Sequence, residues 1–372
     1  MRLKHYKTGE AVEISVDIPS TQPSFFHAPV FIDLQVNGYG GVDFSSPNTL
    51  SEAGVAKVVH ALRAQGVAYF FPTLVTGSFE ATRRSLEFIH KSCRNVDIAR
   101  SITGVHLEGP YISPEDGPRG AHPLAHVRTP DLDEFDAWQD AAGGRIRLVT
   151  LAPEVPGTLA FIEALRDRGV LVALGHTGAT PQQIRDAVAA GATFSTHLGN
   201  GAHLTLPRHP NYLWSQLAED DLYACLIADG HHLPPEVLKV MVRAKGLGKT
   251  ILVSDMTSLA GLEPGSYTFA GSRVELSAAG RISLSGTGYL AGSTLQLPDA
   301  VHNAVTFADI PFAAAVEMAS LVPQRALSSA VGLETFSNET FSVLERTDQG
   351  VRVVALVLKG KTYVQGKQVN EA

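Results

Sequence analysis

The chain has 372 residues and is 44% hydrophobic, which is enough to bury the core of one α/β barrel or of two smaller domains. A formal net charge of -7 without any basic run argues against nucleic acid as a partner, and the lack of a long apolar run or an export signal argues against a membrane. The two cysteines, Cys93 and Cys225, form no C-x-x-C pattern, which favours a reducing cytoplasmic location.

The two ends of the chain alternate apolar and polar residues, as strands with one exposed face do. One such segment is 11–18, which precedes a connector containing Pro, Ser and Gln, and the other is 340–365. We expect residues 1–29 and 340–372 to pair in one small β domain. The main domain would then span residues 30–339.

Eight short apolar segments within the main domain read as buried strands, and stretches of helix length separate them. The strands are expected at 30–38, 67–74, 102–107, 146–151, 171–175, 192–196, 222–228 and 250–254. Helices are expected at 50–65, 81–92, 131–142, 158–168, 180–191 and 234–245. This alternation is typical of a parallel (β/α)₈ barrel of the TIM type. An open doubly wound sheet is the alternative, disfavoured because no G-x-G-x-x-G turn opens a helix after an early strand.

The regular alternation of strands and helices ends after the eighth strand. Residues 266–285 indicate a hairpin, and helices are expected at about 295–306 and 312–320.

Polar side chains stand at the carboxyl ends of six of the eight expected strands. They are Gln35 and Asn37 on the first, Glu108 on the third, His176 on the fifth, His197 on the sixth, Asp229, His231 and His232 on the seventh, and Asp255 on the eighth. Because these ends meet at one mouth of a parallel barrel, we expect the side chains to converge there.

Two neutral imidazoles and one carboxylate suit zinc or iron(II) and leave a coordination position open for water. The favoured ligands are Glu108, His176 and His197. Asp255 would then stand close enough to accept a proton from the bound water, whose pKa zinc can lower to about 7.

Less specific interpretations apply to several of these residues. Glu108 is a possible turn or N-capping carboxylate, since Gly109-Pro110 follows it, and a single histidine after a strand is more often structural than a ligand. His106 points to the same face as Glu108, and it fits packing beneath the metal as well as contact with it. Asp33 is interpreted as a buried, hydrogen-bonded acid, and 38–41 as a tight turn rather than a phosphate loop.

The segments around these residues resemble the N-acetylglucosamine-6-phosphate deacetylases of the amidohydrolase superfamily. The matching segments, in family order, are 31–38, 106–110, 175–180, 196–200, 228–232, 254–255 and 290–293. The resemblance implies a barrel with a small β-sandwich, and one divalent metal ion, zinc or iron(II), on the ligands named above. It also implies that Asp255 is a general base that later protonates the amine, and that His122 polarises the amide carbonyl.

Superfamily members with two metals carry His-x-His on the first strand, where this chain has Gln35 and Asn37. The resemblance therefore favours a single metal, with the second-metal position vacant. The substrate contacts that it implies are Ala121, His122, Asn200, Gly201, Arg208, His232, Leu290, Ala291 and Gly292. In the family, an arginine at the place of Arg208 binds the sugar phosphate, in some members across a dimer interface, so a homodimer is expected. Residues 199–203 and 206–210 depart from the family pattern, and we expect a reshaped phosphate pocket.

The expected reaction is hydrolysis of N-acetylglucosamine 6-phosphate to glucosamine 6-phosphate and acetate. One alternative is an amidohydrolase that acts on another N-acyl amino sugar, a cyclic amide or an amino-purine. Another is a barrel that binds a sugar without catalysis.

Overall fold

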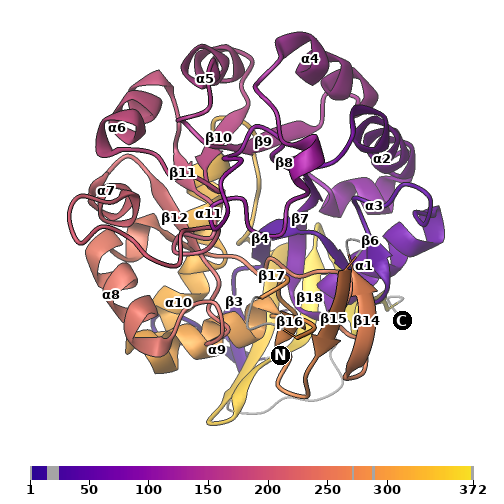
Figure 1. Cartoon of the computed structure of the whole chain (residues 1–372). Coiled ribbons are helices and arrows are strands. Elements are labelled where there is room, and N and C mark those ends of the chain that lie inside the picture. The colour runs from indigo at the N-terminus through magenta and orange to yellow at the C-terminus, as the bar shows by residue number, and fades with distance from the viewer. Residues whose placement is uncertain (1, 15–24, 270–271, 287–289, 370–372) are drawn as a thin grey trace.

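A computed structural model of the chain describes residues 2–14, 25–269, 272–286 and 290–369 (Figure 1). Most of the connector expected after the first β segment lies outside these residues. None of the helices in the described part has the length and apolar character needed to cross a bilayer.

Eight parallel strands form the main sheet, in the order β13-β12-β11-β10-β9-β8-β7-β4. They are β4 (Phe31–Val36), β7 (Val67–Val75), β8 (Val105–Glu108), β9 (Ile146–Leu151), β10 (Leu171–Leu174), β11 (Phe194–Ser195), β12 (Tyr223–Leu226) and β13 (Thr250–Leu252). The sheet closes where Val36 bridges Met256 and where Ser254 N donates to Asp33 Oδ1 at 3.2 Å. The predicted barrel is confirmed.

Helices surround the barrel strands, and all of them except α11, which overlaps the strands in this view, lie in an outer ring (Figure 1). They are α1 (Glu52–Ala64), α2 (Phe79–Ser92), α3 (Val96–Ser101), α4 (Leu132–Ala141), α5 (Thr158–Asp167), α6 (Pro181–Ala190), α7 (Tyr212–Ala218), α8 (Pro235–Lys245), α9 (Leu297–Ala308), α10 (Phe312–Met318) and α11 (Leu321–Leu327). The sequence did not predict α3, α7 or α11. Because α3 runs to Ser101, the third strand begins at Val105 rather than at residue 102, which forms only an isolated bridge to Phe70.

Helix α6 joins the two strands that carry the candidate histidines. It begins with a capping box, in which the Thr180 hydroxyl accepts from Gln183 N at 3.3 Å, and Gly191 follows its last residue at φ 130°. Ile184, Ala187 and Ala190 form its buried face. Both ends of α6 are thereby fixed between β10 and β11, which pair directly in the sheet.

Strands from both chain ends pair in a second sheet, in the order β2-β1-β3-β17-β18-β19-β20. They are β1 (Arg2–His5), β2 (Ala11–Glu13), β3 (Phe25–Ala28), β17 (Thr340–Thr347), β18 (Gly350–Leu358), β19 (Lys361–Val364) and β20 (Lys367–Gln368). β3 runs antiparallel to β17. The expected pairing of the two ends is therefore present, while the domain boundaries at 29/30 and 339/340 remain predictions.

Two small sheets complete the fold. One contains β14 (Gly265–Phe269), β15 (Ser272–Leu276) and β16 (Ile282–Leu284), so the hairpin predicted at 266–285 has a third strand. The other pairs β5 (Gly38–Tyr39) with β6 (Val42–Asp43), which makes residues 38–41 the expected tight turn.

The side chain of Arg63, on α1, ties the barrel to the second sheet. It is fully buried and donates to Asp97 Oδ2 at 2.7 Å and to Ser101 Oγ at 3.1 Å. Its guanidinium also lies 4.5 Å from the ring centroid of Tyr363 on β19. A buried arginine that satisfies its donors in this way holds the two parts in register.

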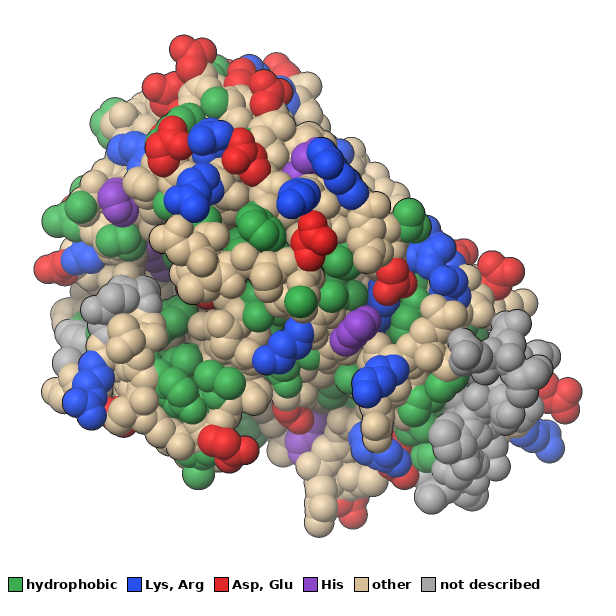
Figure 2. Space-filling model, turned by 90° about the vertical axis from the view of Figure 1, so that its right-hand side faces the viewer, with side chains coloured by type: hydrophobic (Ala, Val, Ile, Leu, Met, Phe, Trp, Pro, Cys, Tyr) green, Lys and Arg blue, Asp and Glu red, His purple; other side chains and the backbone are tan. Residues whose placement is uncertain are grey.

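Acidic and basic side chains are interspersed on the face of the molecule seen in Figure 2. Helices α1 and α2 carry ion pairs, Arg83–Glu80 at 2.9 Å within α2 and Lys91–Glu52 at 3.8 Å between α2 and α1.

Candidate active site

Glu108, His176 and His197 meet at the carboxyl end of the barrel. Glu108 ends β8, and the two histidines follow β10 and β11 by two residues each. Glu108 Oε1 lies 2.9 Å from Nε2 of each histidine, and the two Nε2 atoms are 3.1 Å apart. All three side chains are buried. The predicted ligand set therefore forms one compact cluster that could hold a metal ion.

The donor atoms fit a zinc-type ion. Ligand bonds of about 2.0–2.1 Å at tetrahedral angles place neighbouring donors about 3.3 Å apart, only slightly farther than the distances above. His176 Nδ1 donates to Pro118 O at 2.9 Å, which leaves the Nε2 lone pair facing the cluster. His197 Nε2 also faces Glu108, and its Nδ1 has no hydrogen-bond partner among the described residues.

The backbone turns sharply at three of the candidate residues. His176, His197 and Asp255 have φ values of 51°, 26° and 50°, although none of them is glycine. Left-handed backbone at such residues costs about 1–3 kcal/mol each and is typical of functional sites. At each of these three residues, the left-handed backbone lets the chain turn away from the strand while the side chain of that residue points into the barrel mouth.

Charges within the cluster act on one another. Burial opposes ionisation of Glu108, but the close contacts with His176 and His197 outweigh it and hold the pKa of this carboxyl well below its usual value. Burial also disfavours the cation of His197, but the hydrogen bond with Glu108 raises its pKa. Burial, followed by the charge of Glu108, raises the pKa of Asp255 to about 6.

Asp255 is held by the first barrel strand. Asn37 Nδ2 donates to Asp255 Oδ1 at 2.7 Å. The buried atoms Asn37 Oδ1 and Gln35 Nε2 have no hydrogen-bond partner in the described part of the chain. The two residues at the predicted second-metal position are thus neutral amides, and one of them orients the carboxylate.

The structure decides between the interpretations left open by the sequence. Glu108 Oε1 contacts two histidines, so the turn-capping interpretation is wrong. His106 packs beneath the cluster, with Nε2 2.7 Å from Thr150 Oγ1 and Nδ1 3.1 Å from Leu34 O. Asp33 is the expected buried acid: burial raises its pKa to about 7, and its Oδ1 accepts two backbone N–H groups.

His122 lies beside the cluster. Its ring centroid is 4.3 Å from that of His176, and its Nε2 is 4.0 Å from Glu108 Oε1. Its Nδ1 is 2.7 Å from Thr76 Oγ1. Burial and the neighbouring His176 lower the pKa of His122 to about 3, which leaves the ring neutral near pH 7.

Asp229 fixes the ring of His232. Asp229 Oδ1 accepts from the backbone N–H groups of His231 and His232 at 2.8 and 2.7 Å, and Oδ2 lies 2.6 Å from His232 Nδ1. His232 and Asp255 follow β12 and β13, which pair with each other in the barrel sheet.

The remaining predicted contacts lie on loops. Asn200 Nδ2 donates to His197 O at 3.2 Å, and Gly201 packs against the His176 ring. Ala121 and Arg208 are exposed, and the Arg208 side chain has no hydrogen-bond or ion-pair partner among the described residues. The turn Leu290, Ala291 and Gly292 adjoins the end of β13, because Thr257 N donates to Ser293 O at 2.9 Å.

Comparison with known proteins gives close relatives. A human N-acetylglucosamine-6-phosphate deacetylase is 36% identical over 93% of this chain and 83% of its own length. An Escherichia coli O157:H7 N-acetylgalactosamine-6-phosphate deacetylase is 32% identical over 90% of this chain and 86% of its own length. A crystal structure of N-acetyl-D-glucosamine-6-phosphate deacetylase from Mycobacterium smegmatis superposes with a TM-score of 0.84 at 30% identity over 98% of each chain. No family model matches.

The chain belongs to the N-acetylglucosamine-6-phosphate deacetylase family. The members of this deacetylase family are carbon–nitrogen amide hydrolases with an amidohydrolase-type fold, so the chain is an enzyme of that class.

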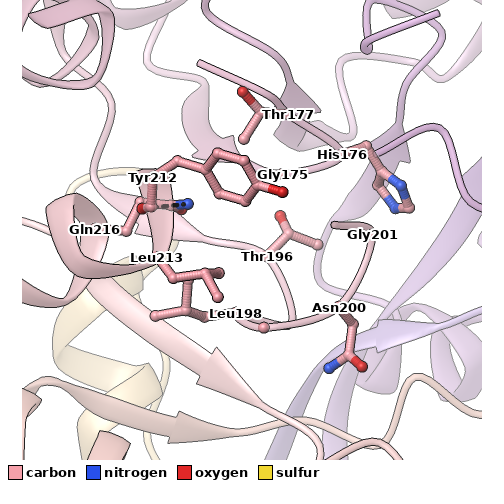
Figure 3. Close-up of a pocket in the computed structure, with 11 residues that line it drawn as sticks. Gly175, His176, Thr177, Thr196, Leu198, Asn200, Gly201, Tyr212, Leu213 and Gln216 are labelled. Atoms are coloured by element: carbon pink, nitrogen blue, oxygen red, sulfur yellow. Dashed lines mark hydrogen bonds between the residues drawn. The ribbon is translucent and has the colours of Figure 1, made fainter. Parts of the chain in front are cut away.

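A pocket beside the cluster is too small for a sugar substrate of this deacetylase family. It lies between α7 and the loops that follow β10 and β11, where Figure 3 shows Tyr212, Thr177 and Thr196 around it. Its volume of about 10 Å³ is that of a single water position.

Sequence reasoning missed a contact that joins two loops of this deacetylase fold. His203 Nε2 lies 3.0 Å from Glu115 Oε2, and both its backbone N and its Nδ1 contact Tyr212 Oη, at 2.8 and 3.1 Å. His203 thus links the loop after β8 to the loop after β11. His203 lies in the segment 199–203, where the sequence departs from the family pattern. That departure was the signal in the sequence that could have pointed to this contact.

Replacing Gly201 with alanine is expected to weaken metal binding in this deacetylase about 10–100-fold, as the loss of a group that supports a ligand does. Gly201 has φ 55°, and an added Cβ would lie 2.7 Å from His176 Nδ1, so either the loop or the ring must move. Metal content after dialysis and kcat are the measurements. Gly248→Ala is the matched control, because an added Cβ there meets nothing within 4 Å. Native metal affinity in Gly201→Ala would contradict the tight packing.

Proposed function

We propose that the chain removes the acetyl group from N-acetylglucosamine 6-phosphate, giving glucosamine 6-phosphate and acetate. The observation that carries this proposal is the buried cluster of Glu108, His176 and His197 beside Asp255, in a chain of the deacetylase family.

Glu108, His176 and His197 would hold one divalent metal ion, zinc or alternatively iron(II). When bound, such an ion lowers the pKa of water and polarises a carbonyl group. A single ion is proposed because Gln35 and Asn37, at the second-metal position, offer neutral amides rather than imidazoles.

Asp255 is the proposed general base and acid. It accepts a proton from the water that attacks the amide carbon, and it returns that proton to the nitrogen as the carbon–nitrogen bond breaks. A protonated amine leaves far more readily than an amide anion. The 2.7 Å hydrogen bond from Asn37 occupies Oδ1 and leaves Oδ2 for these transfers.

His122 is proposed to donate a hydrogen bond to the carbonyl oxygen of the amide. That oxygen gains negative charge as the tetrahedral intermediate forms, so a donor placed beforehand stabilises the transition state more than the substrate. The position of His122 Nε2, 4.0 Å from Glu108 Oε1, supports this role.

Recognition of the sugar phosphate is assigned to the loops. The proposed contacts are Ala121, His122, Asn200, Gly201, Arg208, His232, Leu290, Ala291 and Gly292. Arg208 is exposed and free to meet a phosphate, in its own subunit or in that of a partner. A homodimer in which Arg208 serves the neighbouring site is proposed on the family resemblance.

N-Acetylgalactosamine 6-phosphate is the second candidate substrate. It differs from the glucosamine derivative only in stereochemistry at C4, and the relative from Escherichia coli O157:H7 is named for it.

Steady-state kinetics on the zinc-loaded protein test the proposal. N-Acetylglucosamine 6-phosphate is expected to give the highest kcat/KM when it is compared with its unphosphorylated form and with N-acetylgalactosamine 6-phosphate. Acetate should appear without ammonia, which separates deacetylation from deamination. Equal kcat/KM with and without phosphate would remove the proposed phosphate requirement, and no acetate from any of these sugars would overturn the function.

A further inference from the structure

Thr76 immediately follows β7, the second barrel strand, for which the sequence indicated no functional side chain. It is buried, and its hydroxyl lies 2.7 Å from His122 Nδ1. The backbone N–H of Thr76 also points at the same nitrogen, at a distance of 3.4 Å. Two groups of one residue therefore converge on one ring atom of His122.

These contacts determine which ring nitrogen carries the proton. A backbone N–H can only donate a hydrogen bond, so His122 Nδ1 must accept it. A proton on Nδ1 would point at the N–H hydrogen, and the two would repel. The hydroxyl of Thr76 has one hydrogen and two acceptors within reach, Glu108 O at 3.5 Å and His122 Nδ1 at 2.7 Å, and the shorter contact favours donation to Nδ1. The proton of the neutral ring is then on Nε2.

Nε2 is the ring nitrogen of His122 that lies toward Glu108 and the proposed metal site. It lies 4.0 Å from Glu108 Oε1, too far for a hydrogen bond, and has no hydrogen-bond partner among the described residues. An Nε2–H group here is free to donate to an incoming carbonyl oxygen. The opposite tautomer would present a lone pair and repel the same oxygen.

The structure keeps space for the hydroxyl. Gly109, directly after Glu108, has φ 81°, and an added Cβ there would lie 2.2 Å from Thr76 Oγ1. Glycine at position 109, directly after the proposed metal ligand Glu108, thus leaves room for the Thr76 hydroxyl where it contacts His122.

We propose that Thr76 is a positioning residue that fixes His122 in the Nε2–H tautomer, so that His122 can donate to the substrate carbonyl. This inference rests on the proposed deacetylase function. It adds a residue that acts through His122 without touching the substrate.

The test compares Thr76→Val with Thr76→Ser in the zinc-loaded enzyme. Valine keeps the shape but removes the hydroxyl, and serine restores it. Thr76→Val is expected to lower kcat about 10–100-fold with KM changed less than about threefold, as for a lost transition-state donor, while Thr76→Ser keeps near-native kcat. Thr158→Val is the control, because it removes a buried threonine hydroxyl that bonds only Ala152 O, at 3.3 Å.

A spectroscopic measurement tests the tautomer directly. In protein labelled with ¹⁵N at histidine, His122, assigned by comparison with His122→Gln, should show a protonated Nε2 and an unprotonated Nδ1. Thr76→Val should shift part of the population to the Nδ1–H tautomer, because only the longer backbone N–H contact at 3.4 Å then remains.

Native kcat in Thr76→Val, equal losses in the valine and serine variants, or a proton on Nδ1 in the native enzyme would each overturn the inference. The tautomer of His122 is measured without substrate, so it tests the role of Thr76 even if the native protein releases no acetate. The absence of acetate release would overturn the proposed function and not the role of Thr76.

Discussion

Asp255→Asn is expected to lower kcat by about 10²–10⁴-fold and to leave the fold and metal content intact. Asparagine has nearly the same shape, and its carbonyl oxygen can still accept the 2.7 Å hydrogen bond from Asn37. It cannot take a proton from water or return one to the amine. The measurements are kcat with saturating N-acetylglucosamine 6-phosphate, bound metal per chain and melting temperature.

Asp348→Asn is the control for this variant, because Asp348 is an exposed residue in the turn between β17 and β18. It should behave as the native enzyme. If Asp255→Asn retained a rate within about threefold of native, proton transfer would have to be assigned to another group.

His176→Ala is expected to remove both the metal and the activity. The variant leaves Glu108 and His197 as the only proposed ligands, and two donors rarely retain zinc against dialysis. We expect about one ion per chain in the native protein, well under half an ion in the variant, and a loss of kcat of about 10³-fold or more. Elemental analysis and acetate release measure the two effects.

His60→Ala is the matched control, since His60 is an exposed residue on α1. Treating the native enzyme with a chelator should reproduce the loss, and added zinc should restore it. Two ions per native chain would contradict the single-metal proposal. Full activity in metal-free protein would remove the metal from the reaction.

Much of the barrel and its metal cluster could be predicted because both depend on local patterns. Buried parallel strands are nearly continuous apolar runs, and their carboxyl ends share one face of the barrel, so residues as distant as Glu108 and His197 could be grouped from strand ends alone. The same logic failed at the third strand, where 102 is apolar but follows directly on α3.

Contacts that depend on loop geometry could not be predicted. Thr76 is an ordinary threonine in the sequence, and only the path of the 109–122 loop brings His122 to its hydroxyl. The turn Leu290, Ala291 and Gly292 was placed by family resemblance, and its packing against Thr257 has no signature in hydrophobic periodicity. Within the described part of the chain, the Arg208 side chain has no hydrogen bond or ion pair that would reveal its role, since its proposed partner is a ligand.

The antiparallel pairing of β3 with β17 has a consequence for synthesis. Ala28 pairs with Ser342, so more than 300 residues must leave the ribosome before β3 gains its neighbour on that side. At about 5–20 residues per second, that interval lasts about 15–60 s. During it, the edge of β3 that later meets β17 offers unpaired N–H and C=O groups, which is a setting that favours chaperone capture or wrong pairing with another nascent chain. Yield from overexpression should therefore depend on translation rate and temperature more than the stability of the finished barrel would suggest.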